Sequence, residues 1–162
     1  MFFKAFARFL SLLARSGAYI CKASCSIPVV CKPYEIGGIP YFDGALSDPV
    51  PVEKAFEAGC DKVVLLLTLP ESRVGTPDKD MPIAKILRRT YPGSAEEPET
   101  RYRKYNDGIK KAQEYANREK LLILSPNDTC GVSTLSKNKE GFRNLFDKGF
   151  KEGEKIKKFL HL

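Results

Sequence analysis

Two short apolar runs constrain the fold of this 162-residue chain more than any other feature. The first extends from Val63 to Leu67, and the second lies in the segment KLLILSP, residues 120–126. Consecutive apolar residues are typical of a strand buried on both faces, as in a parallel sheet. Helical patterns lie between the two runs and after the second. This order predicts an α/β fold, with a mostly parallel sheet flanked by helices.

Shorter elements are expected before the first run. Residues 19–23 are a candidate short strand, and the turn pair Gly37-Gly38 predicts a hairpin within YEIGGIPYFDG. Two doubly buried strands need neighbours on both sides. We therefore expect that strands near residues 19–23 and 35–42 complete the sheet, or that part of the sheet lies outside this chain.

Four segments show helical signals. Pro51 and Gly59 suit the two ends of a helix, and MPIAKILRRT predicts another. Apolar residues recur at helical spacing from Tyr102 to Ala116 and again in the last 25 residues. In that last segment Gly149 and Gly153 weaken the helical signal. One side of it is expected to be apolar: Phe142, Leu145, Phe146 and Phe150.

The basic charge of the chain is concentrated at its beginning. Five of the 27 Lys and Arg residues precede Glu35, whereas none of the 20 acids does. The remainder is nearly balanced, with 22 cations against 20 acids. Nucleic-acid binding normally needs a clustered basic face on the folded body. We therefore predict no nucleic-acid partner.

Residues 1–18 form a basic, amphipathic N-terminal segment, and residues 19–162 are predicted to form the remaining domain. Apolar residues at helical spacing from 2 to 15 lie opposite three cations. The segment is too short and too charged to span a bilayer. Three interpretations stay open: a helix packed on its own core, contact with an anionic membrane surface, or an organelle-targeting peptide.

The cysteine and histidine content argues against a metal centre. There are five cysteines, no Cys-x-x-Cys and one histidine, so no ordinary zinc site can be assembled. Cys60 and Cys130 adjoin the apolar runs and are predicted to be buried, reduced thiols. This favours a reducing compartment, and we expect a cytoplasmic protein with or without membrane association.

Asp43 lies between an aromatic pair and a glycine, in YFDGALSDPVP. Asp-Gly is a common turn pair, so a purely structural turn is one interpretation. The other is that Asp43 is a catalytic acid.

A longer string of features around Asp43 resembles the distal half of patatin-like phospholipases. The string is KASCSIPVVCKPYEIGGIPYFDGALSDPVPVEKAFEAGCDKVVLLLT, and the likeness continues from LLILSPNDTCGVS to the end of the chain. SCSIP corresponds to the family's Ser-x-x-Pro stretch. The Asp-Gly-Ala triplet, Asp43, Gly44 and Ala45, corresponds to its aspartate motif. The resemblance implies a partial copy of the patatin-like layout.

The resemblance also implies a function. Patatin-like enzymes hydrolyse fatty-acyl ester bonds in lipid metabolism and degradation, with a Ser–Asp dyad and no metal or organic cofactor. Asp43 is then the dyad base that activates a serine. Gly44 and Ala45 shape the turn that aims it, and the substrate is a lipid or fatty-acyl ester.

The chain departs from the family at the nucleophile. It contains no Gly-x-Ser-x-Gly and no glycine-rich oxyanion loop. Four explanations stay open: a truncated gene product, a mispredicted start, a second chain that supplies the missing half, or a non-catalytic remnant or lipid-associated binding module. Ser24 and Ser26 precede Asp43 but lack the elbow glycines.

The remaining candidates are predicted to be structural. Asp48 suits a turn or a helix cap, and Asp61 a strand entry. Cys25 and Cys31 have no histidine nearby to lower their pKa and are expected to pack. His161 lies too close to the C-terminus to complete a triad without folding back into the site.

Overall fold

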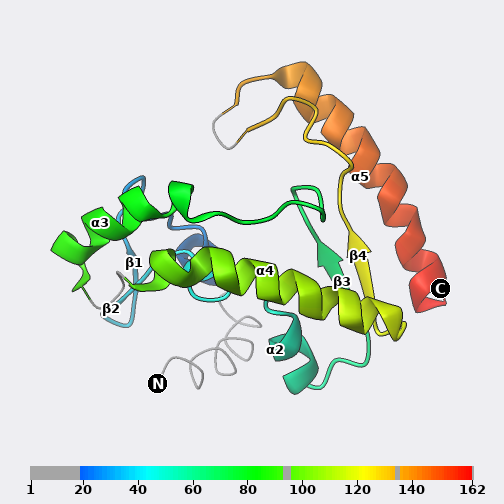
Figure 1. The fold of residues 1–162 in the computed structure, drawn as a ribbon, viewed down its shortest axis with the longest axis horizontal. Helices are drawn as coiled ribbons and strands as arrows, with labels where there is room; N and C mark the ends of the chain where they lie inside the picture. The colour runs from blue at the N-terminus through cyan, green and yellow to red at the C-terminus, as the bar shows by residue number, and fades with distance from the viewer. Residues whose placement is uncertain (1–18, 93–95, 134–135, 162) are drawn as a thin grey trace. The chain divides into compact units, whose positions relative to one another are not determined.

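The computed structural model describes residues 19–92, 96–133 and 136–161, and they group into two compact units. The first unit is drawn from Met1–Val50 and Gly75–Tyr105, and the second from Pro51–Val74 and Asn106–Leu162. Figure 1 shows the elements along the chain. The expected amphipathic helix of residues 2–15 lies outside the described residues.

The first unit contains a short hairpin and two longer helical segments. The hairpin strands are β1 (Tyr34–Ile36) and β2 (Ile39–Tyr41), which pair antiparallel. Gly37 and Gly38 both have positive φ, +60° and +77°, as a two-residue hairpin turn requires. The predicted hairpin is confirmed. The other elements of this unit are η1 (Gly44–Leu46), η2 (Pro77–Lys79), α3 (Met81–Thr90) and the first half of α4 (Glu96–Asn117).

The strand predicted at residues 19–23 is wrong, because residues 19–24 are helical. The Cys25 N–H donates to the carbonyl of Cys21 at 3.0 Å, which is the hydrogen bond of a helical turn. The segment buries Ile20 and Ala23, three residues apart, as one face of a helix does. Residues 19–23 therefore add no strand to the predicted sheet.

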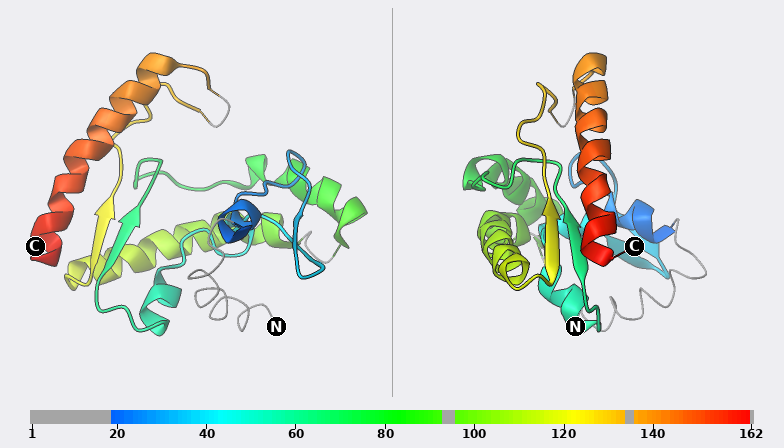
Figure 2. Two further views of the ribbon diagram at one scale, coloured as in Figure 1. Left: turned by 180° about the vertical axis from the view of Figure 1, so that it is seen from behind. Right: turned by 90° about the vertical axis from the view of Figure 1, so that its right-hand side faces the viewer.

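The second unit holds the parallel sheet. Strand β3 (Val63–Leu66) pairs in parallel with β4 (Leu121–Leu124), in the register Val63 with Leu121 and Leu66 with Leu124. In Figure 2 the second half of α4 and helix α5 (Lys139–Leu160) lie on opposite sides of the two strands. Helix α2 (Val52–Glu57) contacts β3, and Gly59 follows it with φ +92°. The predicted α/β class, with helices flanking a parallel pair, is confirmed.

The two strands are less buried than their sequences suggest. In the part of the chain that the structure describes, the sheet has only two strands, and the hairpin β1–β2 forms a separate sheet. Leu66 is 68% exposed, whereas Leu121 and Leu124 are buried. The expectation of full burial on both faces is wrong for β3, because a strand without a second neighbour stays partly open to solvent.

Helix α5 is fixed at its start by local contacts. Asn138 caps it by accepting the Gly141 N–H at 2.9 Å, and Lys148 Nζ lies 2.6 Å from Asp128 Oδ2. The helix runs without interruption through Gly149 and Gly153. Leu145 is half-buried, whereas Phe142, Phe146 and Phe150 are exposed.

The predicted burial of the cysteines is also wrong. All five are free thiols; Cys60 is exposed, and Cys130 is only partly buried. Both lie outside the strands, Cys60 before β3 and Cys130 after β4. Cys25 and Cys31 are exposed as well.

The paired residues Leu66 and Leu124 test whether the hydrophobic core of the second unit lies on the side of Leu124. We expect Leu124→Ala to lower the free energy of unfolding by about 2–5 kcal/mol, because it leaves a cavity beside a buried strand. Leu66→Ala is the matched control and should cost less than about 1 kcal/mol. Chemical denaturation measures both. Equal losses would contradict the difference in burial between 5% and 68%.

The Asp128–Lys148 pair predicts a pH dependence. Lys148 Nζ, and then the Cys130 N–H, hold the pKa of Asp128 at about 2, below its usual 3.8. A depressed pKa contributes stability above about pH 4 that is lost as the pH falls toward about 2. We expect Lys148→Met to raise this pKa most of the way to 3.8, as measured by NMR titration. Lys151→Met is the control and should leave it unchanged.

Candidate functional site

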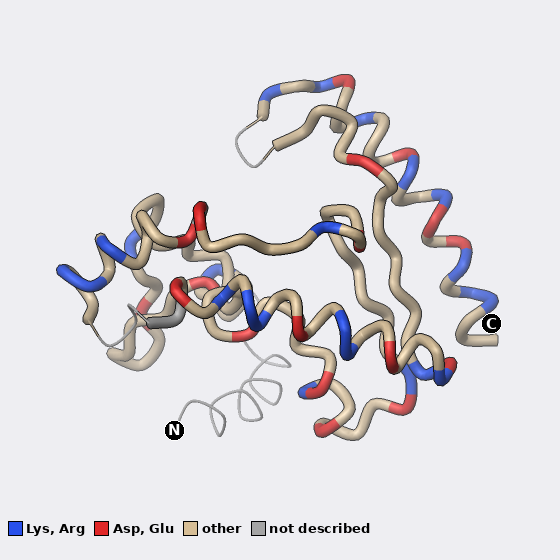
Figure 3. The backbone as a smooth tube through the Cα atoms, in the orientation of Figure 1, with Lys and Arg blue, Asp and Glu red and all other residues tan. Residues whose placement is uncertain are grey.

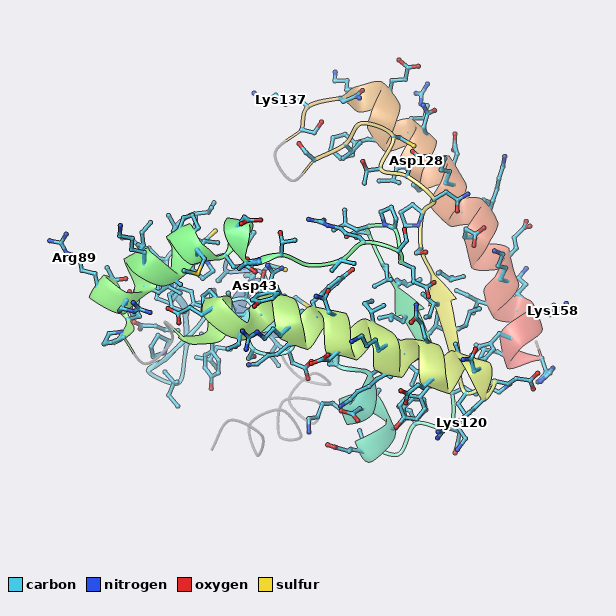
Figure 4. All side chains as sticks on the ribbon, in the orientation of Figure 1. Asp43, Arg89, Lys120, Asp128, Lys137 and Lys158 are labelled. Carbon is cyan, nitrogen blue, oxygen red and sulfur yellow. The ribbon has the colours of Figure 1, made fainter. Side chains whose placement is uncertain are left out.

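Asp43 lies just after strand β2, at the start of the short helix η1. Its Oδ1 accepts the Ala45 N–H at 2.8 Å, so the side chain caps η1. Its own N–H donates to the Ser26 carbonyl at 3.0 Å, which ties the turn to the preceding loop. Figure 4 labels Asp43 in the first unit. The residue is half-buried, with its backbone held from both sides.

Gly44 lies close to another segment at this turn. A Cβ on Gly44 would lie 3.3 Å from the Ser24 hydroxyl oxygen, tighter than ordinary van der Waals contact. A side chain at position 44 would therefore push Ser24 away from the turn. The Asp-Gly-Ala turn thus packs directly on the segment that contains Ser24 and Ser26.

The two serines differ in their surroundings. Ser26 is buried, and its hydroxyl donates to the Lys22 carbonyl at 2.9 Å. Ser24 is exposed. Among the described residues no hydrogen bond joins either hydroxyl to the Asp43 carboxylate. The structure thus brings Ser24, Ser26 and Asp43 into one region, without the serine–base hydrogen bond of a formed dyad.

An ion pair with a buried carboxylate holds the other side of the turn. Arg101, on α4, donates from Nε to the Ala45 carbonyl at 3.0 Å and from Nη1 to Asp80 Oδ1 at 2.7 Å. Asp80 is only 5% exposed and directly precedes α3. We call these two side chains the Asp80–Arg101 pair. Because one guanidinium bonds both partners, the pair fixes Ala45 relative to the start of α3.

An aromatic contact fixes the residue before Asp43. The ring of Phe42 meets that of Tyr91 edge to face, with centroids 5.1 Å apart. Tyr91 ends helix α3, so this contact and the Asp80–Arg101 pair connect the turn to both ends of α3. Asp43 is thereby flanked by two anchored residues.

The carboxylate keeps one oxygen for further chemistry. Oδ1 is used by the Ala45 N–H, whereas no hydrogen bond to Oδ2 is recorded among the described residues. A half-buried carboxylate oriented in this way can accept a proton or hydrogen bond from a hydroxyl group. The observed cap also fits a purely structural turn, so the geometry is compatible with both interpretations made from the sequence.

The other candidate residues lie elsewhere. His161 ends α5 in the second unit, with φ +58°. Asp48 follows η1, where its N–H donates to the Gly44 carbonyl at 3.0 Å, and Pro51 occupies the N-cap position of α2. Within the described segments no three His, Cys, Asp or Glu side chains gather closely enough to hold a metal ion. Across the same segments no helix is long and apolar enough to cross a bilayer.

The matched family covers the turn itself. Residues 15–56 match the family Patatin-like phospholipase. The matched range includes Asp43, Gly44 and Ala45 and ends within α2, so it leaves out both strands of the parallel sheet. It is a partial match, to a family of lipid acyl hydrolases that act on lipid esters. No curated protein and no solved structure matches the chain.

Sequence reasoning missed the Asp80–Arg101 pair. Asp80 stands before a helical pattern and Arg101 within another, and both resemble ordinary surface charges. The two residues are 21 positions apart, and Arg101 is 56 positions from Ala45. No local spacing rule connects positions at such separations. Only the unusual burial of Asp80 distinguishes it, and burial is not visible in the sequence.

We expect Arg101→Met to destabilise the first unit by about 3–5 kcal/mol, because the Asp80 carboxylate would remain buried without its partner. Arg103→Met is the matched control, two positions along the same helix and fully exposed, and should leave the stability nearly unchanged. Urea denaturation followed by circular dichroism measures both. Similar losses would show that the ion pair does not hold this unit.

Proposed function

We propose that this chain carries the aspartate part of a patatin-like lipid acyl hydrolase and that Asp43 is its base. The observation that carries the proposal is the family match over a half-buried carboxylate that uses Oδ1 to accept the Ala45 N–H. The substrate class is a fatty-acyl ester of a lipid.

In the proposed reaction a serine hydroxyl donates its hydrogen bond to Asp43 Oδ2. The serine oxygen attacks the ester carbonyl, and its proton passes to the carboxylate and then to the departing alcohol. Water, activated by the same carboxylate, cleaves the acyl-enzyme and releases the fatty acid. The Ala45 N–H keeps Oδ1 in place, so that Oδ2 faces the serine throughout.

The serine remains to be assigned. The chain holds no Gly-x-Ser-x-Gly, so we propose that the nucleophile comes from residues outside it, on the same or a second polypeptide. Ser24 is the alternative within the chain, because its hydroxyl lies against Gly44. A second candidate function is a lipid-associated binding module without catalysis, which the absent elbow serine favours.

The first experiment measures hydrolysis of a short-chain p-nitrophenyl ester and labelling by a fluorophosphonate, both with the full chain. If the chain is active, we expect Asp43→Asn to lower the rate by about 10²–10⁴-fold, since the amide cannot accept the serine proton. Asp48→Asn, on the same loop, is the matched control and should keep the activity. Mass spectrometry of the labelled protein identifies the serine.

An inactive, unlabelled chain would exclude catalysis by these 162 residues alone. In that case the coding DNA upstream of Met1 is examined for an in-frame glycine-rich loop and Gly-x-Ser-x-Gly, and the longer product is assayed with the same pair of variants. Activity that survives Asp43→Asn in either product would overturn the role of Asp43.

A further inference from the structure

Helix α5 carries a row of exposed aromatic rings. Phe142, Phe146 and Phe150 follow one another at intervals of four residues and are 46%, 70% and 70% exposed. The rings of Phe146 and Phe150 stack with centroids 6.4 Å apart. We call these three residues the Phe row. Aligned rings of this size in contact with water are unusual on a surface that has no partner.

The helix is already anchored by a different face. Leu145, Ile156 and Phe159 are half-buried, and α5 contacts β4. Lys62 Nζ donates to the Phe159 carbonyl at 2.6 Å and lies 4.7 Å from the centroid of its ring. The Phe row therefore stays exposed although another face of the helix packs on its own unit.

Beside the Phe row, the helix surface has positions without side chains. Gly149 and Gly153 lie on the same side of the helix by their spacing, and a Cβ on either would meet nothing within 4 Å. The row therefore forms a narrow apolar ridge whose rings project beyond the neighbouring backbone. A ridge of this kind needs a surface that can deform around it.

Positive charge lies at both ends of the row. Lys139 stands three residues before Phe142, and Lys157 stands seven after Phe150, so both are in line with the rings. Arg143 flanks the row, and the acids Asp147 and Glu154 lie along the same border. Along its whole length α5 carries seven Lys and Arg against four Asp and Glu, which Figure 3 shows as alternating blue and red.

We propose that the Phe row docks this chain onto an anionic lipid surface. Helix α5 lies in the plane of the interface, with the three rings among the acyl chains. Lys139 and Lys157 extend their side chains to the headgroup phosphates at the two ends. The proposal does not rest on the proposed hydrolytic function, since docking through α5 requires neither Asp43 nor a serine.

A second copy of this chain is a less suitable binding partner for the Phe row than an anionic bilayer. In an antiparallel pairing that places Phe146 of one copy on Phe150 of the other, the same symmetry places Lys139 opposite Lys157. Like charges would then face each other at both ends of the contact. An anionic bilayer satisfies both lysines at once, and it accommodates a convex ridge without a matching groove.

A single tryptophan reports directly on the row. The chain contains no Trp, so Phe150→Trp makes a unique fluorophore. With vesicles of phosphatidylcholine and about 30% phosphatidylserine, which carry a negative surface potential, we expect its emission to shift to the blue and brominated acyl chains to quench it. Tyr91→Trp, in the first unit, is the control and should show neither effect.

Loss of the rings should weaken binding in flotation assays with the full chain. We expect Phe146→Ser combined with Phe150→Ser to reduce the bound fraction about tenfold or more. Leu66→Ser with Val74→Ser is the matched control, because these residues of the same unit are 68% and 71% exposed. Pure phosphatidylcholine vesicles should bind the unaltered chain about tenfold less well than anionic ones.

Three results would overturn the proposal. Flotation of the Phe150→Trp variant without any shift of its emission would place the contact on another segment, such as residues 2–15. A blue shift without bromine quenching, together with a larger mass in solution, would mean that a second copy covers the row. Equal loss of binding in the two double variants to serine would mean that the rings have no specific role in binding the vesicles.

Discussion

The buried carboxylate of Asp80 is the constraint on which the first unit depends. A charge placed out of water needs a partner, and Arg101 provides it at 2.7 Å. The same guanidinium holds the Ala45 carbonyl, so the position of the Asp-Gly-Ala turn follows from the need to neutralise Asp80. The orientation of Asp43 is thereby set by α3 and α4, and not by the turn alone.

The exposure of apolar side chains in the second unit reflects the two-stranded sheet that its described residues form. A sheet of two parallel strands is not fully covered, and apolar side chains such as Leu66 remain exposed to water. Helix α5 covers part of the pair but keeps the Phe row outside. Leu66 and the Phe row are both apolar surfaces that the described elements of this unit leave exposed.

The local elements were predictable, since each depends on a short-range rule. The hairpin follows from Gly37-Gly38, which alone in this segment permits two successive positive φ values. The parallel pair follows from two apolar runs separated by helical segments. Residues 19–23 contain the strand-favouring Tyr19 and Ile20, whereas the segment forms the hydrogen bonds of a helix. The burial of Cys60 was misjudged because strand composition does not say how many neighbours a strand has.

Local residue patterns specify the α/β class, the hairpin turn, the ends of α2 and the placement of Asp43 next to a glycine. These depend on the spacing of apolar residues and on φ values that few residue types can adopt. Long-range packing determines that Asp80 is buried, that Arg101 bonds Ala45, that Ser24 lies against Gly44, and that the Phe row faces water. Those outcomes depend on contacts between residues far apart in the chain, where no local periodicity carries information about which side chains meet.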